Sequence, residues 1–385
     1  VTGQSPYAVE KYLDTLHRQC MQYAALLKPQ KTVFSELVIG GGTPLYLTEK
    51  QLEQMFQLLR SYFAFSKDAE IIAETAPNQT SAGKLAVLKQ AGVTRVSMGI
   101  QSFQDEELEA LGRRHRAQTA REALHLLKSA DFACVNADFI YGIPGQTVQS
   151  LLASLKEALA WQPEEIFLYP LYVKHGAAME GQGIVPDSAQ AYEQYLHASS
   201  FLRNAGFRQD SMRRFVRAPQ AGQRRYEECG FGTSLALGCG GRSYLGNLHF
   251  STPYAITKES CLARLAEYEQ TADFTQITHG LFLSAQEMQR RYVIRHLLIL
   301  PGLLLERYEQ VFGSQAMEDF PMLRSWMERG FAALHRTEEG TFLALTQAGI
   351  GLSDALGPQL TSPQVRAAME EWDQLQAAGT AGKEQ

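Results

Sequence analysis

The sequence predicts an α/β fold in which helices cover a parallel β-sheet, with a smaller α+β region at the carboxyl end. Five short apolar stretches alternate with amphipathic helical stretches over roughly the first 170 residues. Beyond that point the alternation stops, and a series of helices leads to a hairpin pattern. Neighbouring parallel strands need a long crossover connection, which helices supply. The alternating part therefore predicts a parallel sheet that is either doubly wound or barrel-like.

The expected strands and helices follow each other regularly along this part of the chain. Strands are expected at 33–39, 70–74, 94–100, 134–141 and 165–172. Helices are expected at 6–28, 80–91 and 147–160, with further helical stretches between 101 and about 130. Ser5 followed by Pro6 is a typical helix start. One more helix begins at Thr48, which forms a capping box with Gln51.

The carboxyl-terminal half is organised differently. A helix is expected at 188–205, followed by the arginine-rich stretch Arg213–Arg217, which we interpret as a loop. Later helices are expected at 284–297, 303–311 and 318–330. Two short apolar runs then flank Gly340, as a hairpin requires. Helices followed by a hairpin resemble a winged helix, but the segment is not notably basic, so a packing or lid role is expected.

These patterns divide the chain into four parts. Residues 1–175 are expected to form the barrel-like part, and 176–280 an extension with loops on the substrate side. Residues 281–375 are expected to form the small winged-helix-like domain. The small and polar residues 376–385 are expected to be disordered.

The composition argues against several classes of protein. The chain has 385 residues, of which 45% are hydrophobic, and a net charge of −5, which argues against a nucleic-acid partner. No apolar run approaches the length of about 18 residues that a membrane span needs, and no secretory signal opens the chain. Five scattered cysteines fit the reduced cytoplasm better than a disulfide scaffold; they are Cys20, Cys134, Cys229, Cys239 and Cys261.

Polar residues and glycines stand where each predicted strand ends, which is where parallel α/β sheets bind their ligands. The first strand ends in Gly40–Pro44, and later strands carry Glu74, Gln101 and Asp138. Each has an ordinary structural interpretation: a tight turn, a helix cap or a bond to loop backbone. Asp138 stands in an otherwise apolar strand, where a carboxylate needs a partner. Together with Arg113, the set suits a ligand that bears an amino group, a carboxylate and vicinal hydroxyls.

Several of these segments resemble the radical S-adenosylmethionine (SAM) superfamily, and within it the group of oxygen-independent coproporphyrinogen III oxidases. The resemblance rests on Gly-Gly-Gly-Thr-Pro after a strand, then Glu74, then "SMGIQSFQDEELEALGRRH" and "VNADFIYGIPGQT". It is close over residues 31 to about 175 and looser through Leu237–Tyr244 and Leu345–Asp354. The group includes haem chaperones, haem-degrading enzymes and methyltransferases. The resemblance implies a partial (β/α)6 barrel with a small carboxyl-terminal domain.

The resemblance also implies SAM-binding roles for named residues. It assigns the amino group of SAM to Gly41, Gly42 and Thr43, and places Glu74 beside the cofactor. It assigns the polar tail of SAM to Gln101 and Arg113, and the ribose of SAM to Asp138. The family pattern also implies contacts to SAM at Tyr172 and at Arg242, and the alignment at Arg242 is the weaker of the two. Cys239 has no cluster spacing to its nearest cysteine, so we interpret it as a small packing residue.

One departure from the family pattern is large. The family binds a 4Fe–4S cluster through a CxxxCxxC motif on the loop after the first barrel strand, and this chain has no such motif. The first strand and the cluster ligands are therefore expected upstream of Val1, or have been lost. An open sheet edge is expected where that strand belongs.

The leading hypothesis is a radical SAM enzyme in which a 4Fe–4S cluster and SAM generate a 5′-deoxyadenosyl radical that acts on a tetrapyrrole. The family implies an electron donor such as flavodoxin or ferredoxin. Arg213–Arg217 could pair with propionates, although a solvated loop is the favoured interpretation. The alternative is a haem-binding chaperone or a degenerate paralogue without the cluster. Without the resemblance, the glycines alone would not exclude a third hypothesis, a barrel that binds phosphate.

Overall fold

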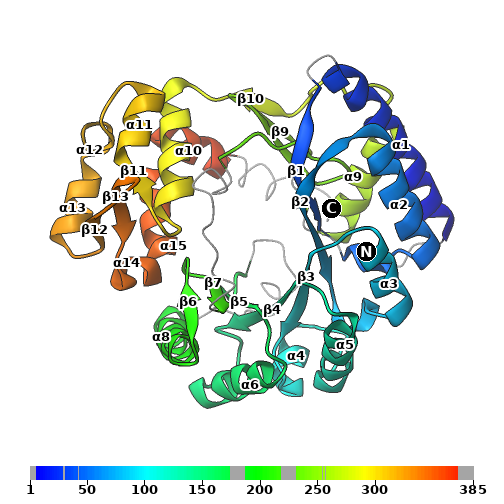
Figure 1. The fold of residues 1–385 in the computed structure, drawn as a ribbon, viewed down its shortest axis with the longest axis horizontal. Coiled ribbons are helices and arrows are strands. Elements are labelled where there is room, and N and C mark those ends of the chain that lie inside the picture. The colour runs from blue at the N-terminus through cyan, green and yellow to red at the C-terminus, as the bar shows by residue number, and fades with distance from the viewer. Residues whose placement is uncertain are drawn as a thin grey trace, which may run out of the picture.

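A curved seven-stranded sheet forms the centre of the larger part of the protein (Figure 1). The computed structural model describes residues 6–28, 31–41, 43–173, 187–217, 231–253, 255 and 257–371. Five strands run parallel in chain order: β1 (Val33–Ile39), β2 (Ala64–Thr75), β3 (Arg95–Gln101), β4 (Cys134–Tyr141) and β5 (Glu165–Pro170). Two short antiparallel strands extend the sheet beyond β5: β7 (Arg214–Arg217) and β6 (Phe207–Gln209). The predicted parallel α/β fold is therefore confirmed, with two strands that the sequence did not reveal.

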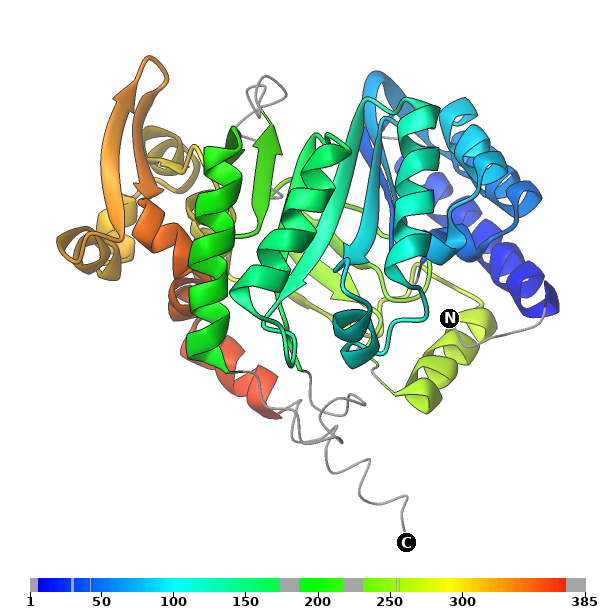
Figure 2. The same ribbon diagram turned by 90° about the horizontal axis from the view of Figure 1, so that it is seen from below.

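Helices cover the outer side of this sheet, as Figures 1 and 2 show. They are α1 (Pro6–Leu27), α2 (Glu49–Tyr62), α3 (Ala82–Gln90), α4 (Asp105–Ala110), α5 (Ala117–Ala130), α6 (Val148–Ala160) and α8 (Ser188–Asn204). The predicted capping box is present at the start of α2, where the Thr48 side chain accepts from the Gln51 amide. Helix α2 then buries Leu52, Phe56 and Leu59. Burying such an apolar face supplies most of the stability of a helix in a protein.

Strand β3 shows how the sheet separates its core face from its inner face. Val96, Met98 and Ile100 are fully buried, whereas the alternate residues Ser97 and Gly99 line a hollow on the other face. The period of two residues along a strand produces this alternation. The hydrophobic core therefore lies between sheet and helices, and the inner face is left for polar side chains.

Strand β1 is the edge of the main sheet, and among the described residues it pairs with β2 alone. Val33 is 59% exposed and Val38 is 50% exposed. The expected open edge is therefore present in the described part of the chain.

A second, three-stranded sheet consists of β8 (Arg242–Leu245), β9 (Leu248–Ser251) and β10 (Gly280–Phe282), all antiparallel. Helix α9 (Lys258–Gln270) lies between β9 and β10 in the chain. Figure 1 places β9 and β10 between β1 of the main sheet and the carboxyl-terminal helix α10 (Ala285–Leu297).

The carboxyl-terminal region contains the predicted helices and hairpin. After α10 come β11 (Leu303–Leu304), α11 (Leu305–Phe312), α12 (Ala316–Asp319), α13 (Met322–Glu328), β12 (Ala332–Thr337) and β13 (Gly340–Leu345). The hairpin β12–β13 turns at 338–339, and β11 adds a third strand. Helices α14 (Gln347–Gly351) and α15 (Ser353–Leu356) follow, and the sequence did not predict them. The boundaries proposed between the parts of the chain stay predictions.

Several boundaries differ from the sequence prediction. Strand β2 begins at Ala64 rather than at 70, and pairs with β1 across an irregularity in register. The helix expected at 318–330 is interrupted at Pro321, where proline limits the backbone. The loop expected at Arg213–Arg217 is wrong, because Arg214–Arg217 is strand β7. The tail 376–385, Gly42 and much of the segment around 174–230 lie outside the described residues.

Within the described residues, a search for a helix both long and apolar enough to cross a membrane finds none.

Candidate functional site

An open hollow lies where the parallel strands of the main sheet end. Its volume is about 160 Å³. Strands β1 to β4 and the loops after them supply its lining, which is Gly41, Thr43, Glu74, Thr75, Ala76, Ser97, Gly99, Gln101, Arg113 and Asp138. Six of the residues predicted from the sequence are therefore brought together: Gly41, Thr43, Glu74, Gln101, Arg113 and Asp138.

The glycine loop after β1 lies directly against Glu74 of β2. The amide of Gly41 donates to Glu74 Oε2 at 3.1 Å. A Cβ atom at Gly40 would stand 2.9 Å from the Glu74 carboxyl carbon, which is too close for ordinary contact. Gly41 has φ of 106° and Thr43 has φ of 65°, both in the left-handed region. Bare backbone at this point allows the loop and the carboxylate to face the same hollow.

Gln101 closes β3 in a backbone conformation that is unusual for a residue with a side chain. Its φ is 72°, it is 8% exposed, and the pairing with β4 shifts between Gly99 and Gln101. A Cβ atom at Gly99 would stand 2.5 Å from Gln101 Nε2. Gly99 therefore makes the space into which the Gln101 amide turns, and strained backbone of this kind is typical of functional sites.

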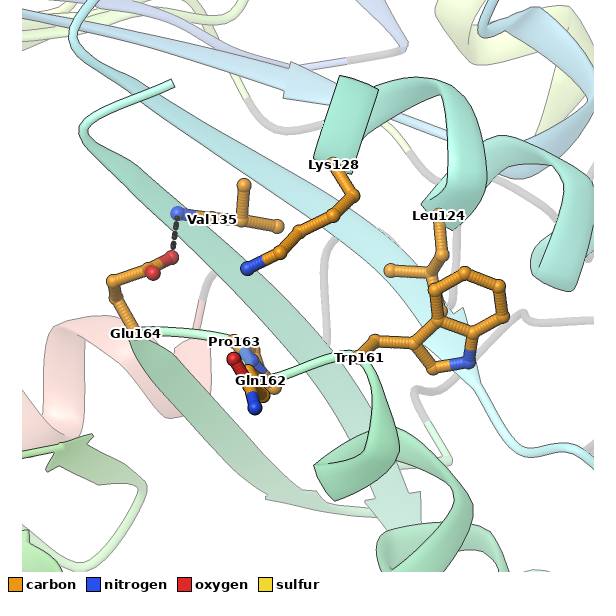
Figure 3. A pocket seen from close by; sticks show the side chains of 7 residues that line it. All are labelled: Leu124, Lys128, Val135, Trp161, Gln162, Pro163 and Glu164. Atoms are coloured by element: carbon orange, nitrogen blue, oxygen red, sulfur yellow. Dashed lines mark hydrogen bonds between the residues drawn. The ribbon is translucent and has the colours of Figure 1, made fainter. Parts of the chain in front are cut away.

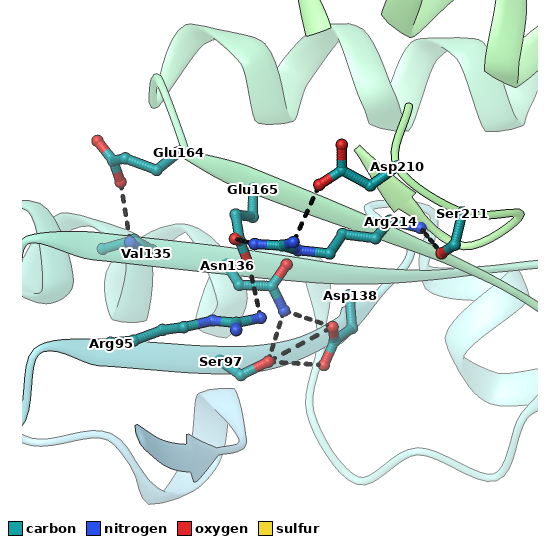
Figure 4. Close-up of polar contacts among 10 residues, drawn as sticks. All are labelled: Arg95, Ser97, Val135, Asn136, Asp138, Glu164, Glu165, Asp210, Ser211 and Arg214. Atoms are coloured by element: carbon teal, nitrogen blue, oxygen red, sulfur yellow. Dashed lines mark hydrogen bonds and ion pairs between the residues drawn. The ribbon is translucent and has the colours of Figure 1, made fainter. Parts of the chain in front are cut away.

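Asp138 of β4 is held by two polar neighbours on the inner face of the sheet (Figure 4). Asn136 Nδ2 donates to Asp138 Oδ1 at 2.7 Å, and Ser97 Oγ donates to Oδ2 at 3.3 Å. Burial raises the pKa of Asp138 to about 7, and the bonds from Asn136 and Ser97 oppose that rise. The nearby Glu74 carboxylate raises the same pKa further. This carboxyl group can therefore accept hydroxyl donors in its charged form and hold a proton near neutral pH.

Four charged side chains make a buried network farther down the inner face (Figure 4). Glu165 of β5 bonds Arg95 of β3 at 2.6 Å and also pairs with Arg214 of β7. Arg214 in turn pairs with Asp210 at 3.0 Å. The two buried arginines and the two buried carboxylates balance in charge, as a buried ionic group requires. The half-exposed Arg208 adds a further bond to Asp210 at 2.8 Å. The arginine-rich stretch therefore serves the protein's own interior in this structure, and its interpretation as a solvated loop is wrong.

The segment after β3 brings Arg113 to the rim of the hollow. The Arg113 amide donates to the carbonyl of Leu108 at 2.9 Å and thereby ends α4. His115 Nε2 lies 3.2 Å from the carbonyl oxygen of Ile100, and burial lowers the His115 pKa. A neutral, anchored His115 fixes the segment that carries Arg113. Within the described residues, the Arg113 side chain has no ion pair or hydrogen bond.

Two predicted cofactor residues lie outside the lining of the hollow. Tyr172, which is 54% exposed, bonds Asp354 of α15, and Arg213 Nη2 donates to the Tyr172 hydroxyl at 2.6 Å. Arg242 is exposed on β8. Gly42, a third predicted residue, lies outside the described residues. The roles expected for these three stay predictions.

Sequence reasoning missed a buried carboxylate that joins two of the segments quoted above. Glu107 of α4 accepts from Ser102 at 2.6 Å, from Gln146 at 3.0 Å and from Ser150 at 2.5 Å. Ser102 and Gln146 come from "SMGIQSFQDEEL" and "YGIPGQT" respectively. The sequence did show polar residues after each strand. It could not show that Glu107 bonds to donors from a different loop, because that contact depends on the fold. Glu107 therefore holds the loops around the hollow rather than facing it.

A second, far smaller hollow lies at the opposite, amino end of strands β4 and β5 (Figure 3). Its volume is about 10 Å³, and its lining includes Val135, Trp161 and Glu164. Glu164 accepts from the amide of Val135 at 2.8 Å there. This space holds about one water molecule, so the larger hollow is the candidate site.

The described residues do not supply ligands for an iron–sulfur cluster. No group of three histidine, cysteine, aspartate or glutamate side chains in the described part of the chain is placed to hold a metal ion. Cys20, Cys134, Cys239 and Cys261 are free thiols. Cys239 packs against the hydrophobic core, and burial raises its pKa, which fits the packing role expected for it.

Comparison with known proteins shows which proteins this chain is similar to. The family model of the radical SAM superfamily matches residues 7–158. The chain is 26% identical over 349 residues to the heme chaperone HemW of Bacillus subtilis (strain 168), with 87% of each chain covered. It is 27% identical over 316 residues to the oxygen-independent coproporphyrinogen III oxidase of Escherichia coli (strain K12), covering 77% of this chain and 67% of that protein.

The fold agrees with these sequence relationships. Coproporphyrinogen III oxidase (HemN) from Escherichia coli superposes with a TM-score of 0.78 at 23% identity, covering 91% of this chain and 83% of the other. At that identity the likeness shows the fold alone. The chain thus carries a radical SAM domain, and its homologues are HemW proteins and HemN-type coproporphyrinogen oxidases.

Proposed function

We propose that this protein binds SAM in the hollow at the ends of β1 to β4 and acts on a tetrapyrrole, as a radical SAM enzyme of the coproporphyrinogen III oxidase-like group. One observation carries the proposal: a single hollow combines bare glycine backbone, two carboxylates, an amide and an unpaired guanidinium. A phosphate site would need cations or several converging amides beside the glycines. The Glu74 carboxylate, which lies against this loop, would repel phosphate.

Four polar side chains of the hollow have counterparts in SAM. Glu74 and the backbone carbonyls beside it suit the ammonium group, which has only donors. Arg113 suits the carboxylate, because a guanidinium fork matches the geometry of a carboxylate. Asp138 suits the two ribose hydroxyls, and the Gln101 amide offers both a donor and an acceptor to the polar tail. The SAM-binding roles of Gly42, Tyr172 and Arg242 belong to the same proposal on the basis of the family pattern.

Radical chemistry in this superfamily is supplied by a 4Fe–4S cluster, which delivers the electron that cleaves SAM. Because the described residues hold no ligand set for that cluster, the proposal for this chain concerns what its own residues do. They bind SAM, orient its methionine end and hold a proton at Asp138. A flavodoxin or ferredoxin as electron donor, and a cytoplasmic location, are further parts of the proposal.

The tetrapyrrole part of the proposal is supported by the names of the relatives, which handle heme or coproporphyrinogen. A second candidate function is a haem-binding chaperone, and the match to heme chaperone HemW over 87% of both chains favours it. The two functions differ in whether SAM is consumed. Analysis of 5′-deoxyadenosine by chromatography, after reduction in the presence of haem or coproporphyrinogen, separates them.

Isothermal titration calorimetry of the full chain with SAM tests the site itself. Arg113→Ala should weaken SAM binding at least tenfold, because a charge-assisted hydrogen bond contributes about 1.5–3 kcal/mol. Arg114→Ala is the matched control, since Arg114 does not line the hollow, and it should bind SAM as the parent protein does. Equal loss in both variants, or no SAM binding by the parent protein, would contradict the proposed site.

A further inference from the structure

Two polar side chains that have no role in the proposed SAM site hold the Asp138 carboxylate. Asn136 and Asp138 lie two residues apart on β4, so their side chains lie on the same face of the sheet. Ser97 of β3 is the direct partner of Asn136 on the neighbouring strand. Neighbouring strands lie about 4.8 Å apart. The register of β3 and β4 therefore brings three polar side chains to one point on the inner face.

The side-chain amide of Asn136 uses both of its hydrogens within this set (Figure 4). Asn136 Nδ2 donates to Ser97 Oγ at 2.5 Å and to Asp138 Oδ1 at 2.7 Å. The Ser97 hydroxyl has one hydrogen of its own, which it donates to Asp138, where Oδ2 lies at 3.3 Å and Oδ1 at 3.5 Å. Asn136 therefore acts on Asp138 twice, once directly and once by orienting Ser97.

The fold fixes the orientation of the Asn136 amide. The reverse orientation would place the amide oxygen against the Asp138 carboxylate, and two acceptors repel each other. The amide oxygen instead points away from Asp138, on the side where Arg214 lies (Figure 4). Asn136 is 1% exposed, and its direct partner on β5 is Glu165 of the buried ionic network. The network therefore borders the amide on the side opposite to Asp138.

The acceptor sites that remain on Asp138 match two adjacent hydroxyl groups. An ionised carboxylate offers about four acceptor sites, two on each oxygen. Asn136 occupies one site on Oδ1, and Ser97 lies nearest to Oδ2. Each oxygen thus keeps a site for a donor from the hollow, which Asp138 lines. A protonated carboxyl group carries a donor of its own and cannot accept both hydroxyls in this way.

The ionisation of Asp138 depends on what surrounds it. Burial raises its pKa to about 7, and the bonds from Asn136 and Ser97 lower it. Without these two donors the group would therefore stay protonated to a higher pH. The charged or titratable side chains that face Asp138 or share its hollow come from several elements and are Glu74 of β2, Arg95 of β3, Tyr169 of β5 and Arg113 at the rim.

We propose that Asn136 and Ser97 are positioning residues for SAM, which keep the Asp138 carboxylate ionised and oriented toward the ribose hydroxyls. The inference rests on the proposed SAM site and deepens it. Its consequence is that SAM binding displaces a proton from Asp138 near neutral pH, because only the ionised group accepts both hydroxyls. The proton passes to the solvent, and the affinity for SAM is thereby linked to pH.

Calorimetric titration of the full chain with SAM, from about pH 5.5 to about pH 8.5, tests the inference. The affinity of the parent protein should fall as the pH drops through about 7. Asn136→Ala should move the midpoint of this fall up by about one pH unit, because the charged form loses a donor. Ser97→Ala should move it in the same direction by less, because its bond is longer. Asp138→Asn should abolish the midpoint. The ammonium group of SAM titrates near pH 8, but it is common to all variants and cancels in the comparison.

Proton release on binding distinguishes positioning from structural damage. Calorimetry at pH 7 in two buffers of different ionisation enthalpy measures the protons released for each SAM bound. The parent protein should release about half a proton, Asn136→Ala should release more, and Asp138→Asn should lose this release. A variant that is merely damaged would bind SAM more weakly without releasing more. Asn247→Ala, at an exposed asparagine, is the matched control and should equal the parent in midpoint and in proton release.

The outcomes separate this inference from the proposed function. If Asn136→Ala and Ser97→Ala leave both the midpoint and the proton release unchanged, the two residues do not position Asp138. If the parent protein binds SAM with the same affinity at every pH, or if Asp138→Asn keeps the midpoint, the inference is wrong while the SAM site stands. If the parent protein binds no SAM at any pH, the proposed function fails as well. Thermal melting shows whether each variant is folded, and Ser97→Ala decides the question if Asn136→Ala is not.

Discussion

Replacing Asp138 with asparagine should change the stability of the protein and its affinity for SAM in opposite directions. Burial raises the pKa of the Asp138 carboxyl from its ordinary value of 3.8 to about 7 in the folded protein. A group with a raised folded pKa stabilises the fold at low pH, and this contribution is lost as the pH rises through the folded value. A rise from 3.8 to about 7 corresponds to a loss of about 4 kcal/mol between those two pH values.

Asparagine has nearly the shape of aspartate and does not titrate. The stability of Asp138→Asn relative to the parent protein should therefore increase by about 4 kcal/mol from near pH 4 to about pH 8. Other titrating groups are common to both proteins, so their effects cancel in the difference between the two free energies of unfolding. Urea denaturation followed by circular dichroism measures these free energies at each pH. Asp68→Asn, at an exposed carboxylate of β2, is the control and should show no such trend.

The same substitution should weaken SAM binding, because the ribose loses a charged acceptor. A hydrogen bond to a charged group contributes about 1.5–3 kcal/mol, or roughly a tenfold to hundredfold change in the dissociation constant. Calorimetry above pH 7, where the parent carboxylate is ionised, measures the change. A stability difference that is flat with pH would refute the buried-carboxylate reasoning. Unchanged SAM affinity would show that Asp138 only shapes the floor of the hollow.

Two further substitutions probe the loops around the hollow. Gly40→Ala should weaken SAM binding at least tenfold, because the new Cβ would displace the Glu74 carboxylate. Calorimetry with SAM measures this. Gly232→Ala is the control, since Gly232 has open space around it. Glu107→Ala should lower the free energy of unfolding by about 2–5 kcal/mol, since it leaves buried donors without their acceptor. Urea denaturation measures the free energy of unfolding, with Glu106→Ala at an exposed glutamate as the control. If both variants lose an equally small amount of stability, the hydrogen bonds assigned to Glu107 are contradicted.

The sequence was sufficient to predict which strand ends form the hollow. Alternating apolar and helical stretches dictate parallel strands, and their carboxyl ends then meet at one edge of the sheet. Glu74, Gln101 and Asp138 could therefore be predicted to lie together before any coordinates were known. Their partners could not. Ser97 and Gly99 matter only because β3 pairs with β4 in one register and because Gln101 turns back over Gly99.

Charged residues were the main source of error, because their partners lie far away in the chain. Arg214 stands among other arginines in the sequence, which favours a solvated loop, yet it faces Glu165, 49 positions before it. Burial of a charge is decided by a partner that only the folded chain supplies. The same reason explains why Glu107 was not singled out: its acceptor oxygens serve donors up to 43 positions away.

The contact between Tyr172, Arg213 and Asp354 limits how this protein can be recombined with its relatives. Arg213 Nη2 lies 2.6 Å from Asp354 Oδ1, and the same carboxylate binds the Tyr172 hydroxyl. Two of these residues belong to the main sheet region, and the third lies 141 positions after Arg213, in α15. A chimaera that takes its carboxyl-terminal helices from another family member inherits Arg213 and Tyr172 without their acceptor, unless the donor also carries an acid at that turn. A chimaera that keeps this contact must therefore be joined upstream of Tyr172 or downstream of Asp354. A junction between these two residues would separate the partners.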